Sequence, residues 1–377
     1  MKEATNLSII RHFKDLSDPR ILKKTDHELI DIVVIAICAV ICGADKWTQV
    51  EAFGRARYDW LKSFLGLRNG IPSHDTFGRL FAIISPVKFQ DCFKAWIEEV
   101  FTTTSGEIIA VDGKTLRRSF NKQDNKAALH MVHAWATANS ILLGQQATEA
   151  KSNEITAIPQ LLELLALKGC IVTIDAMGCQ IKIAKTIRES EGDYVLAVKG
   201  NQGELYESIQ DTFRLAQTKA FAKMDYDNHQ TIDGGHGRVE TRTCHVLSAT
   251  HLYPRQVKWM DLQSIILLES EVVNKNTGEC SKESRYYISS LKPDASRIAH
   301  AIRQHWAVEN NLHWCLDVTF REDECRSRIG DSAENFSLLR RIALMLLRNE
   351  KTFKGGLQTK RLQAGWNNDY LLKVLLA

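Results

Sequence analysis

Three acidic residues stand where the predicted elements could bring them to one place. Asp112 follows the apolar run Ile108–Val111, and Asp175 follows a second apolar run, Cys170–Ile174. Both runs have the length of buried β-strands. In open α/β sheets functional groups gather at the carboxyl ends of neighbouring parallel strands, so we expect the two aspartates at one sheet edge. Glu309, in a long helical stretch, is the third candidate.

The two aspartates predict a metal site. Carboxylates a few ångströms apart repel each other unless one is protonated or a cation lies between them. Divalent ions such as Mg²⁺ or Mn²⁺ take oxygen ligands and suit such a pair. Asp-Gly after Val111 and Asp-Ala-Met-Gly after Ile174 are also ordinary turn sequences. The hypothesis therefore depends on both aspartates together with the order of the elements around them.

Glu309 belongs to a polar stripe on a helix predicted from about residue 295 to residue 317. His305, Glu309, His313 and Asp317 are each four residues apart, so they lie along one helix face. A glutamate in the middle of this stripe can point toward the two aspartates. The alternative is a solvated helix face with i,i+4 pairs. The two histidines are about 12 Å apart along an α-helix, which argues against a zinc site held by both.

Basic and polar side chains beside the strand ends suggest contacts with phosphate. The candidates there and in the β-rich stretch beyond are Lys114, Arg117, Lys199, Asn201, Gln202, His236 and Arg238. A second basic region runs from residue 335 to residue 377, where eight basic residues stand against two acidic ones. Such local charge fits a phosphate-rich partner. A solvated surface explains each of these residues about as well.

The composition is that of a folded protein of 377 residues, long enough for two or three domains. Hydrophobic residues make up 44% and the net charge is +4, which excludes a chain that is polycationic throughout. The nine cysteines are scattered without a CxxC pair, as is typical of a reduced, cytosolic protein. The longest apolar run, residues 32–44, is too short to span a bilayer, so no membrane partner is expected.

The hydrophobic pattern divides the chain into regions. Residues 1–104 show helical spacing. Beyond them the expected order is β-β-β-α-β-α-β-α, with an antiparallel meander first and then buried parallel strands separated by helices. The expected strands are 108–111, 129–137, 141–148, 170–174 and 194–198, and the helices are 154–167, 180–191 and 204–216. Residues 221–292 return to strands, at 238–246, 263–272 and 285–290, before helices resume. This pattern predicts an α/β fold with a mixed sheet and flanking helices.

Several stretches, taken together and in order, carry a resemblance. They are IAVDGKTLRRS, KSNEITAIPQLL, TIDAMGCQ, DYVLAVKGNQ, HGRVETR and IRQHWAVENNLHWCLDVTFRED. With Asp112, Asp175 and Glu309, the chain resembles the DDE transposases of insertion sequences. The closest resemblance is to the ISAs1-type family, which includes the H-repeat-associated proteins and lies near the IS4-like group. The resemblance covers almost the whole chain.

The helical spacing of residues 1–104 predicts a small N-terminal helical domain, which could bind DNA or serve as a scaffold or dimer surface. The resemblance implies a ribonuclease H-like catalytic domain, residues 105–377, with a β insertion at about 221–292 and a basic helical C-terminus. Asp112, Asp175 and Glu309 would be the catalytic and metal-binding residues, holding two ions, Mg²⁺ or Mn²⁺. The expected activity is cleavage of DNA at element ends and strand transfer into target DNA.

The expected partner is double-stranded DNA, both the terminal inverted repeats and the target. The protein would act as a homodimer or higher synaptic complex, in the cytoplasm of a bacterium, associated with the nucleoid. IS4-like enzymes surround the glutamate with a Tyr-xx-Arg-xxx-Glu-xxxxxx-Lys pattern. Here those positions hold Ile302, His305, Glu309 and Leu316, so Tyr, Arg and Lys are not kept. His305, assisted by Arg303 or His313, is a candidate replacement for the Arg as a phosphate contact.

Two alternatives stay open at this point. A ribonuclease H-like nuclease would cut DNA without joining it. A domesticated relative would bind DNA without catalysis, although the presence of all three carboxylates argues against that alternative.

Overall fold

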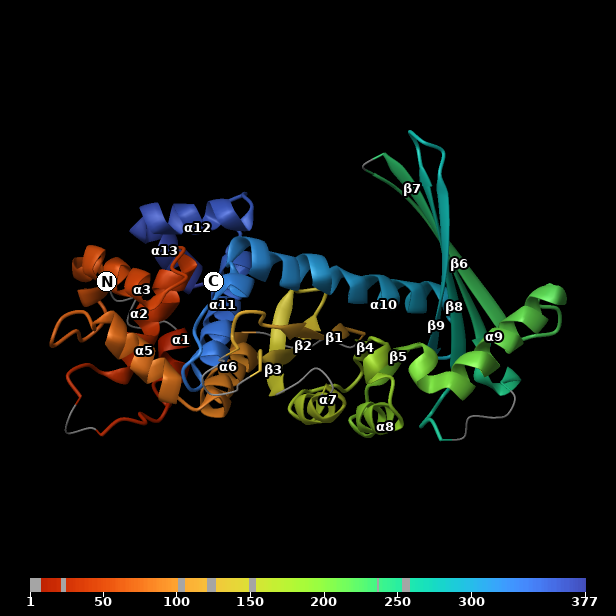
Figure 1. Ribbon diagram of the computed structural model, residues 1–377, viewed down its shortest axis with the longest axis horizontal. Helices are drawn as coiled ribbons and strands as arrows, with labels where there is room; N and C mark the ends of the chain where they lie inside the picture. Colours follow the sequence, from red (N-terminus) through yellow and green to blue (C-terminus); the bar gives the residue numbers. More distant parts are fainter. Residues whose placement is uncertain are drawn as a thin grey trace.

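The computed structural model describes residues 8–21, 25–100, 106–120, 127–148, 154–235, 237–252 and 258–377. Across these ranges a single mixed sheet of nine strands runs through the molecule, in the order β3-β2-β1-β4-β5-β9-β8-β7-β6, with helices packed around it (Figure 1). The strands are β1 Ile108–Thr115, β2 His130–Ala136, β3 Ile141–Thr148, β4 Ile171–Ile174, β5 Asp193–Val198, β6 Tyr226–Gly235, β7 Arg238–Ser248, β8 Ser264–Asn274 and β9 Cys280–Ser289. The predicted α/β class with a mixed sheet is confirmed.

The helices fall into three groups along the chain. Before the sheet come α1 Ser8–Phe13, α2 Leu29–Ile41, α3 Trp47–Ala56, α4 Tyr58–Lys62, α5 His74–Ile83 and α6 Pro86–Val100. Between strands lie α7 Glu154–Glu163, α8 Ile181–Glu189 and α9 Gly203–Thr218. After the sheet come α10 Ala295–Val308, α11 Ser332–Asn349, α12 Leu357–Trp366 and α13 Asn368–Leu375. No helix in the described ranges is long and apolar enough to cross a membrane.

The centre of the sheet has the predicted topology. β1, β2 and β3 form the antiparallel meander, and β4 and β5 follow in parallel with β1. β4 is apolar and fully buried, as expected for a strand with helices on both faces. β1 runs four residues further than predicted, so Asp112 lies within this strand, paired with His133 of β2.

The first and last parts of the chain share one core. All but one of the thirteen residues of α2 are buried, and α2 packs against α11. In Figure 1 the red and orange helices of the N-terminal part lie beside the blue helices of the C-terminal part, at the same end of the sheet. The amide of Asn335 on α11 donates to the carbonyls of Phe81 and Ile84, both at 2.9 Å, at the end of α5. One continuous hydrophobic core therefore contains residues from both sides of the boundary predicted between residues 104 and 105.

Four of the eight basic residues in the C-terminal region are buried, which removes these four from the phosphate-binding surface that the sequence suggested. Arg340 and Arg341 are 1% and 0% exposed, and Lys360 and Arg361 are also buried. Their charges meet protein partners: Arg341 pairs with Glu322 and Arg361 donates to the Val40 carbonyl at 3.0 Å. The residues were assigned to a surface because charge alone does not reveal burial in ion pairs.

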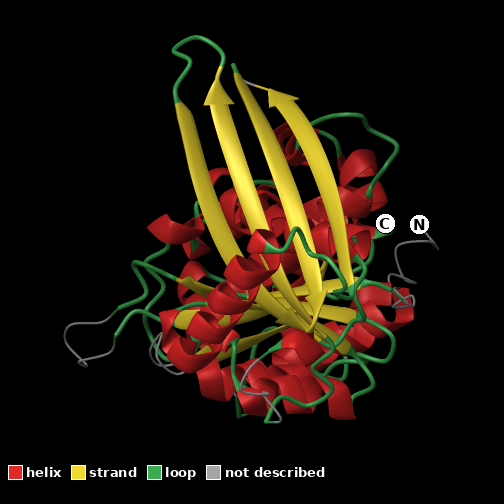
Figure 2. Ribbon diagram, turned by 90° about the vertical axis from the view of Figure 1, so that its right-hand side faces the viewer, coloured by secondary structure: helices red, strands yellow, loops and turns green. Residues whose placement is uncertain are grey.

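The β insertion has four strands rather than three. β6 was missed because its sequence, YDNHQTIDGG, is polar and lacks strand alternation, and most of its residues are exposed. The insertion does not form a second sheet, since β9 pairs with β5 and continues the central one. Figure 2 shows its four long strands rising away from the rest of the sheet.

Candidate functional site

Asp112 and Asp175 lie side by side. β1 and β4 are parallel neighbours in which Val111 is opposite Ile174. The residue that follows Val111 is Asp112, and the residue that follows Ile174 is Asp175. This is the arrangement that the sequence predicted. Asp175 also caps a short 3-10 helix, Ala176–Gly178, and its Oδ1 accepts from the backbone nitrogens of Met177 and Gly178 at 3.1 and 3.4 Å. Those bonds fix the direction of its carboxylate.

The Asp112 carboxyl lies in an environment that resists a negative charge. Burial, together with the nearby carboxylates of Asp175, Glu154 and Glu309, raises its pKa to about 7, although a hydrogen bond from the Gly113 nitrogen acts to lower it. That nitrogen donates to Oδ1 at 2.8 Å, and His313 Nδ1 lies 3.4 Å from Oδ2. Three other carboxyl groups thus act electrostatically on Asp112, and carboxylate oxygens are the ligands that a hard divalent cation takes.

The helix that carries Glu309 differs from the expected continuous α-helix. α10 ends at Val308, and the chain continues as π-helix over Glu309–His313 and Cys315–Thr319. In an α-helix a residue four positions along is rotated by about 40° beyond one full turn, so a stripe with this spacing drifts around the helix. A π turn holds more residues, so the same spacing drifts in the opposite direction. The two drifts oppose each other, and His305, His313 and Asp317 of the stripe all contact the sheet.

Contacts of the stripe with the sheet confirm that it is not a solvated face. His305 Nδ1 lies 3.1 Å from Thr173 Oγ1 on β4, and His313 faces Asp112 on β1. Burial lowers the pKa of His305 to about 4 and that of His313 to about 3, so both imidazoles are neutral near pH 7. Neutral, buried rings favour a positioning role over the phosphate contacts predicted for them.

Glu309 lies at the start of the π segment and is exposed. Its charge reaches Asp112, as the raised pKa of that carboxyl shows. Among the described residues, however, no three His, Cys, Asp or Glu side chains are gathered closely enough to hold a metal ion. The structure thus brings the two aspartates together and places Glu309 within electrostatic range of Asp112.

The Lys114 side chain is buried in an ion pair within the protein. It is 8% exposed, and Nζ lies 2.5 Å from both carboxylate oxygens of Asp317. This ion pair ties the last residue of the polar stripe to β1, two positions beyond Asp112. The geometry favours a positioning role for Lys114 over the DNA contact predicted for it.

The DNA cleavage that the resemblance implies is expected to slow about tenfold or more in Lys114→Gln, because loss of the ion pair releases the Glu309 helix from β1. DNA affinity and its salt dependence should stay close to wild type. Single-turnover cleavage and fluorescence anisotropy measure the two quantities separately. Lys185→Gln, at a side chain of α8 that is 61% exposed, is the control. A Lys114 variant that loses affinity but cleaves normally once saturated with DNA would show a DNA contact instead.

A buried pair that sequence reasoning missed lies under Asp112. His130 of β2 hydrogen-bonds Glu154 of α7 through Nε2 and Thr115 through Nδ1, the latter at 2.8 Å. Glu154 is 4% exposed. The glutamate looked like an ordinary helix start in the sequence, and only the fold brings it beside the aspartates.

This pair explains why glycine follows Asp112. A Cβ on Gly113 would overlap the Glu154 carboxylate and come within 2.6 Å of His130 Nε2. Gly113→Ala should lower the free energy of unfolding by about 1–3 kcal/mol through overpacking. Urea denaturation measures the change. Gly203→Ala is the matched control, because open space surrounds that position and its φ is −51°. Equal stability of the two variants would contradict this packing.

Three of the remaining residues predicted to contact DNA, Lys199, Asn201 and Gln202, lie in the loop after β5, close to Asp175. Lys199 is exposed and lines a pocket of about 400 Å³ beside Asp175, together with Tyr206, Tyr286 and Trp306. Asn201 donates to the Ala176 carbonyl at 2.6 Å, and so joins the loop after β5 to the loop after β4. Gln202 does the same through the Cys179 carbonyl, at 2.9 Å. Asn201 and Gln202 are therefore engaged with the protein backbone, whereas Lys199 presents a positive charge to solvent beside Asp175.

The structure does not place Arg238 beside the two aspartates. This residue is exposed and opens β7 at the tip of the β6–β7 hairpin, which rises away from the central strands (Figure 2). His236 lies outside the described residues. The contacts predicted for both remain predictions.

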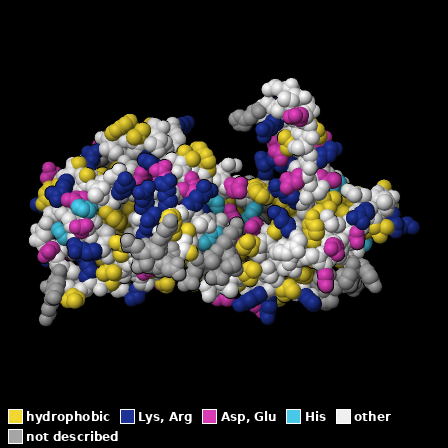
Figure 3. All heavy atoms as spheres, in the orientation of Figure 1, with side chains coloured by type: hydrophobic (Ala, Val, Ile, Leu, Met, Phe, Trp, Pro, Cys, Tyr) yellow, Lys and Arg dark blue, Asp and Glu magenta, His cyan; other side chains and the backbone are white. Residues whose placement is uncertain are grey.

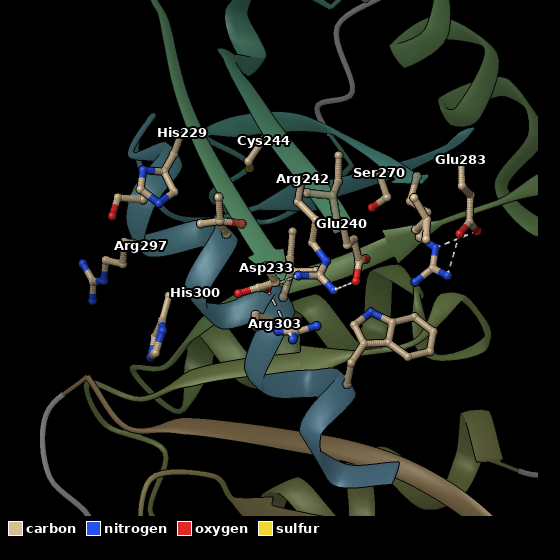
Figure 4. Close-up of a pocket in the computed structure, with 18 of the residues that line it drawn as sticks. His229, Asp233, Glu240, Arg242, Cys244, Ser270, Glu283, Arg297, His300 and Arg303 are labelled. Carbon is tan, nitrogen blue, oxygen red and sulfur yellow. Dashed lines mark hydrogen bonds and ion pairs between the residues drawn. The ribbon is translucent and has the colours of Figure 1, made fainter. Parts of the chain in front are cut away.

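A second groove separates α10 from the insertion strands, and Glu309 belongs to its lining. Figure 4 shows its charged residues facing one another across the groove. Arg242 pairs with Asp233 at 2.6 Å and also with Glu240, and Arg303 of α10 lies 3.6 Å from the same Asp233 carboxylate. These pairs hold β6 and β7 to α10, and hence to the element that carries Glu309.

Comparison with known proteins identifies the family. Residues 103–346 match the transposase DDE domain family, and residues 10–97 match a family described as DDE_Tnp_1-associated. The chain belongs to the DDE transposase family. It is 41% identical over 370 residues to the "H repeat-associated putative transposase YhhI" of Escherichia coli, covering 97% of each chain. It is 44% identical over 370 residues to "Putative transposase YncI", also of Escherichia coli, covering 98% of this chain and 94% of the relative.

The resemblance read from the sequence is thereby confirmed. Transposases act on DNA, and DDE domains in general use divalent metal ions. The match to the transposase DDE domain contains Asp112, Asp175 and Glu309. The carboxylates that the fold brings together are therefore the natural candidates for the reactive centre of this transposase.

Proposed function

We propose that the protein is the transposase of an insertion sequence, which cleaves DNA at the element ends and joins them to target DNA. The catalytic part would be ribonuclease H-like, with Asp112, Asp175 and Glu309 as its acidic residues. The observation that carries the proposal is the parallel register of β1 and β4, which sets two aspartates side by side at one sheet edge. Family membership makes DNA the substrate.

The acidic residues would hold Mg²⁺ or Mn²⁺, most simply two ions. The donor set fits them because carboxylate oxygens are the ligands that these ions prefer. When bound, such ions lower the pKa of an attacking water or 3′-hydroxyl and stabilise the leaving oxygen.

The protein's own groups orient this centre. The Gly113 nitrogen and His313 hold the two oxygens of Asp112. His305 and the Lys114–Asp317 pair hold the Glu309 helix against β4 and β1. In the first step, water attacks the phosphodiester and frees a 3′-hydroxyl. In the second, that hydroxyl attacks a target phosphodiester in line, so one P–O bond forms as another breaks and no covalent protein–DNA intermediate is needed.

A strand-transfer assay tests the proposal. A duplex that ends in a recessed 3′-hydroxyl of the element's own terminal repeat is incubated with supercoiled plasmid and Mn²⁺. We expect joined product that depends on the 3′-hydroxyl and is lost with a 3′-deoxy end. Nicked plasmid without joined product would instead show a nuclease that cuts only. Two element ends must be processed together, so a homodimer or higher synaptic complex is the expected active form.

A further inference from the structure

A groove rich in arginine lies at the junction of three segments that are far apart in the sequence. Lys46 stands at the start of α3, Arg118 follows β1, and Arg326 and Arg328 lie in the loop before α11. We call this surface the Arg118 groove. In Figure 3 Lys and Arg side chains gather densely left of centre, between the N-terminal helices and the middle of the molecule. None of these four residues belongs to the acidic centre.

The charges of the groove are mostly free to meet a ligand. Lys46, Arg118 and Arg326 are exposed, and within the described ranges none of them lies within ion-pair distance of a carboxylate. Of the two acidic residues in the lining, Glu324 pairs with Arg321. Asp45 is half-buried and lies 4.0 Å from Arg361. The groove thus keeps a net positive charge after its internal pairs are counted.

The walls of the groove are fixed. Arg328 donates to the Arg118 carbonyl at 3.0 Å and lies over the ring of Phe120, with 4.7 Å between guanidinium and ring centre. The Asp331 nitrogen donates to the Ala82 carbonyl at 3.0 Å, which joins this loop to α5. These contacts hold Arg328 and the backbone of the loop, so a ligand has to order only the exposed side chains of the groove.

The groove is continuous with the strand that carries Asp112. Arg118 is six residues beyond Asp112, so the two lie no more than about 20 Å apart even if the chain is extended. Each strand of B-DNA has one phosphate per roughly 3.4 Å of helix axis, and 20 Å corresponds to about six base pairs. A duplex with its reactive phosphate at Asp112 reaches the groove within that length.

We infer that the Arg118 groove binds the sugar–phosphate backbone of duplex DNA flanking the reactive position, through Lys46, Arg118, Arg326 and Arg328. Exposed guanidinium groups suit phosphate, which they bind in bidentate geometry. The inference rests on the proposed function in that DNA is the substrate, but binding here requires neither metal nor catalysis. It also gives the N-terminal helices a role, because Lys46 supplies one wall.

The test measures binding without cleavage. Wild type and Arg118→Gln/Arg326→Gln/Arg328→Gln are titrated against a fluorescent duplex of arbitrary sequence, in EDTA, over a range of salt concentrations. We expect the variant to lose at least about tenfold in affinity, and the slope of log K against log salt to become shallower by about two to three. Because Arg328 also holds the loop, Arg118→Gln/Arg326→Gln is tested in parallel, with a change in slope of about one to two.

The control removes the same charge elsewhere. Arg214, Lys219 and Lys223 are exposed on and after α9, and the triple change to Gln lowers the net charge equally. We expect this control to keep nearly wild-type affinity. Equal losses in control and groove variants would overturn the inference in favour of diffuse attraction, as would wild-type binding by both groove variants. Asp112→Asn should bind normally, so failure of catalysis and failure of the groove are separately visible.

A native thiol gives a second, positional readout. Cys325 lies in the lining of the groove and is not bonded to another cysteine. A duplex that carries a disulfide-activated thiol tether on a backbone phosphate about six base pairs from the nick should form an adduct with wild type. The adduct should be lost in Cys325→Ser and persist in Cys280→Ser, which removes an exposed cysteine of the insertion. An adduct that survives Cys325→Ser would place the DNA elsewhere and contradict the inference.

Discussion

Asp112→Asn is expected to reduce metal-dependent DNA cleavage by at least about a thousandfold while leaving DNA binding and folding intact. The amide matches the carboxylate in shape but carries no charge, and a loss of about 4 kcal/mol in transition-state stabilisation corresponds to that factor. Its Oδ1 can still accept from the Gly113 nitrogen. Single-turnover cleavage of a duplex that contains the terminal repeat measures the rate, and anisotropy in EDTA measures binding.

Asp211→Asn serves as its control, because that aspartate is exposed on α9, where it pairs only with Arg214 at the surface. The control should cleave at the wild-type rate. An Asp112 variant with near wild-type activity would remove this residue from the reactive centre. A variant that fails to bind DNA would show that Asp112 acts on the fold and not on the chemistry.

Glu322→Gln is expected to lower the free energy of unfolding by about 3–5 kcal/mol, the cost of leaving a buried arginine without its counter-charge. Glu322 and Arg341 are both 0% exposed at their side chains, and Arg341 Nη1 donates to Oε1 at 2.7 Å. The same guanidinium donates to His133 Nε2 at 2.6 Å, and His133 is the neighbour of Asp112 across β1 and β2. The network therefore supports the strand that carries the first aspartate. Urea denaturation followed by tryptophan fluorescence measures the loss.

Two comparisons separate the charge from the packing. Replacing both partners, as Glu322→Met/Arg341→Met, removes both buried charges and should give a protein more stable than Glu322→Gln alone. Burial alone would raise the pKa of Glu322, but the charges of Arg341, Arg340 and Lys114 outweigh it and hold this pKa below its usual range. The stabilisation by Glu322 is therefore present above its unfolded pKa of about 4.3 and is lost as the pH falls through the lower, folded value. A double variant less stable than the single one would contradict this account.

The sequence was sufficient to predict the neighbourhood of the two aspartates. Apolar runs of strand length, each ending at an aspartate and separated by helices, allow few topologies, and right-handed crossovers make parallel neighbours the expected arrangement. The spacing of His305, Glu309, His313 and Asp317 likewise predicted one face. Both predictions rest on local periodicity, which a sequence displays directly.

Other features depend on tertiary contacts and could not be read in this way. The π turns after Val308 could not be predicted, because the spacing of polar and apolar residues does not distinguish a π turn from an α-helical one. Arg340 and Arg341 looked like surface charge because Glu322, their buried neighbour in the fold, lies well before them in the chain. β6 is polar because only one of its edges is paired and its face is exposed.

Binding of Mn²⁺ tests the central claim most directly, because it asks whether the two aspartates form one site before any DNA chemistry occurs. Calorimetric titration of the full chain with Mn²⁺ should show saturable binding in wild type and in Asp211→Asn. That binding should be lost in both Asp112→Asn and Asp175→Asn, and weakened in Glu309→Gln. Undiminished Mn²⁺ binding in Asp112→Asn and Asp175→Asn, with both proteins folded, would contradict a metal centre at this sheet edge.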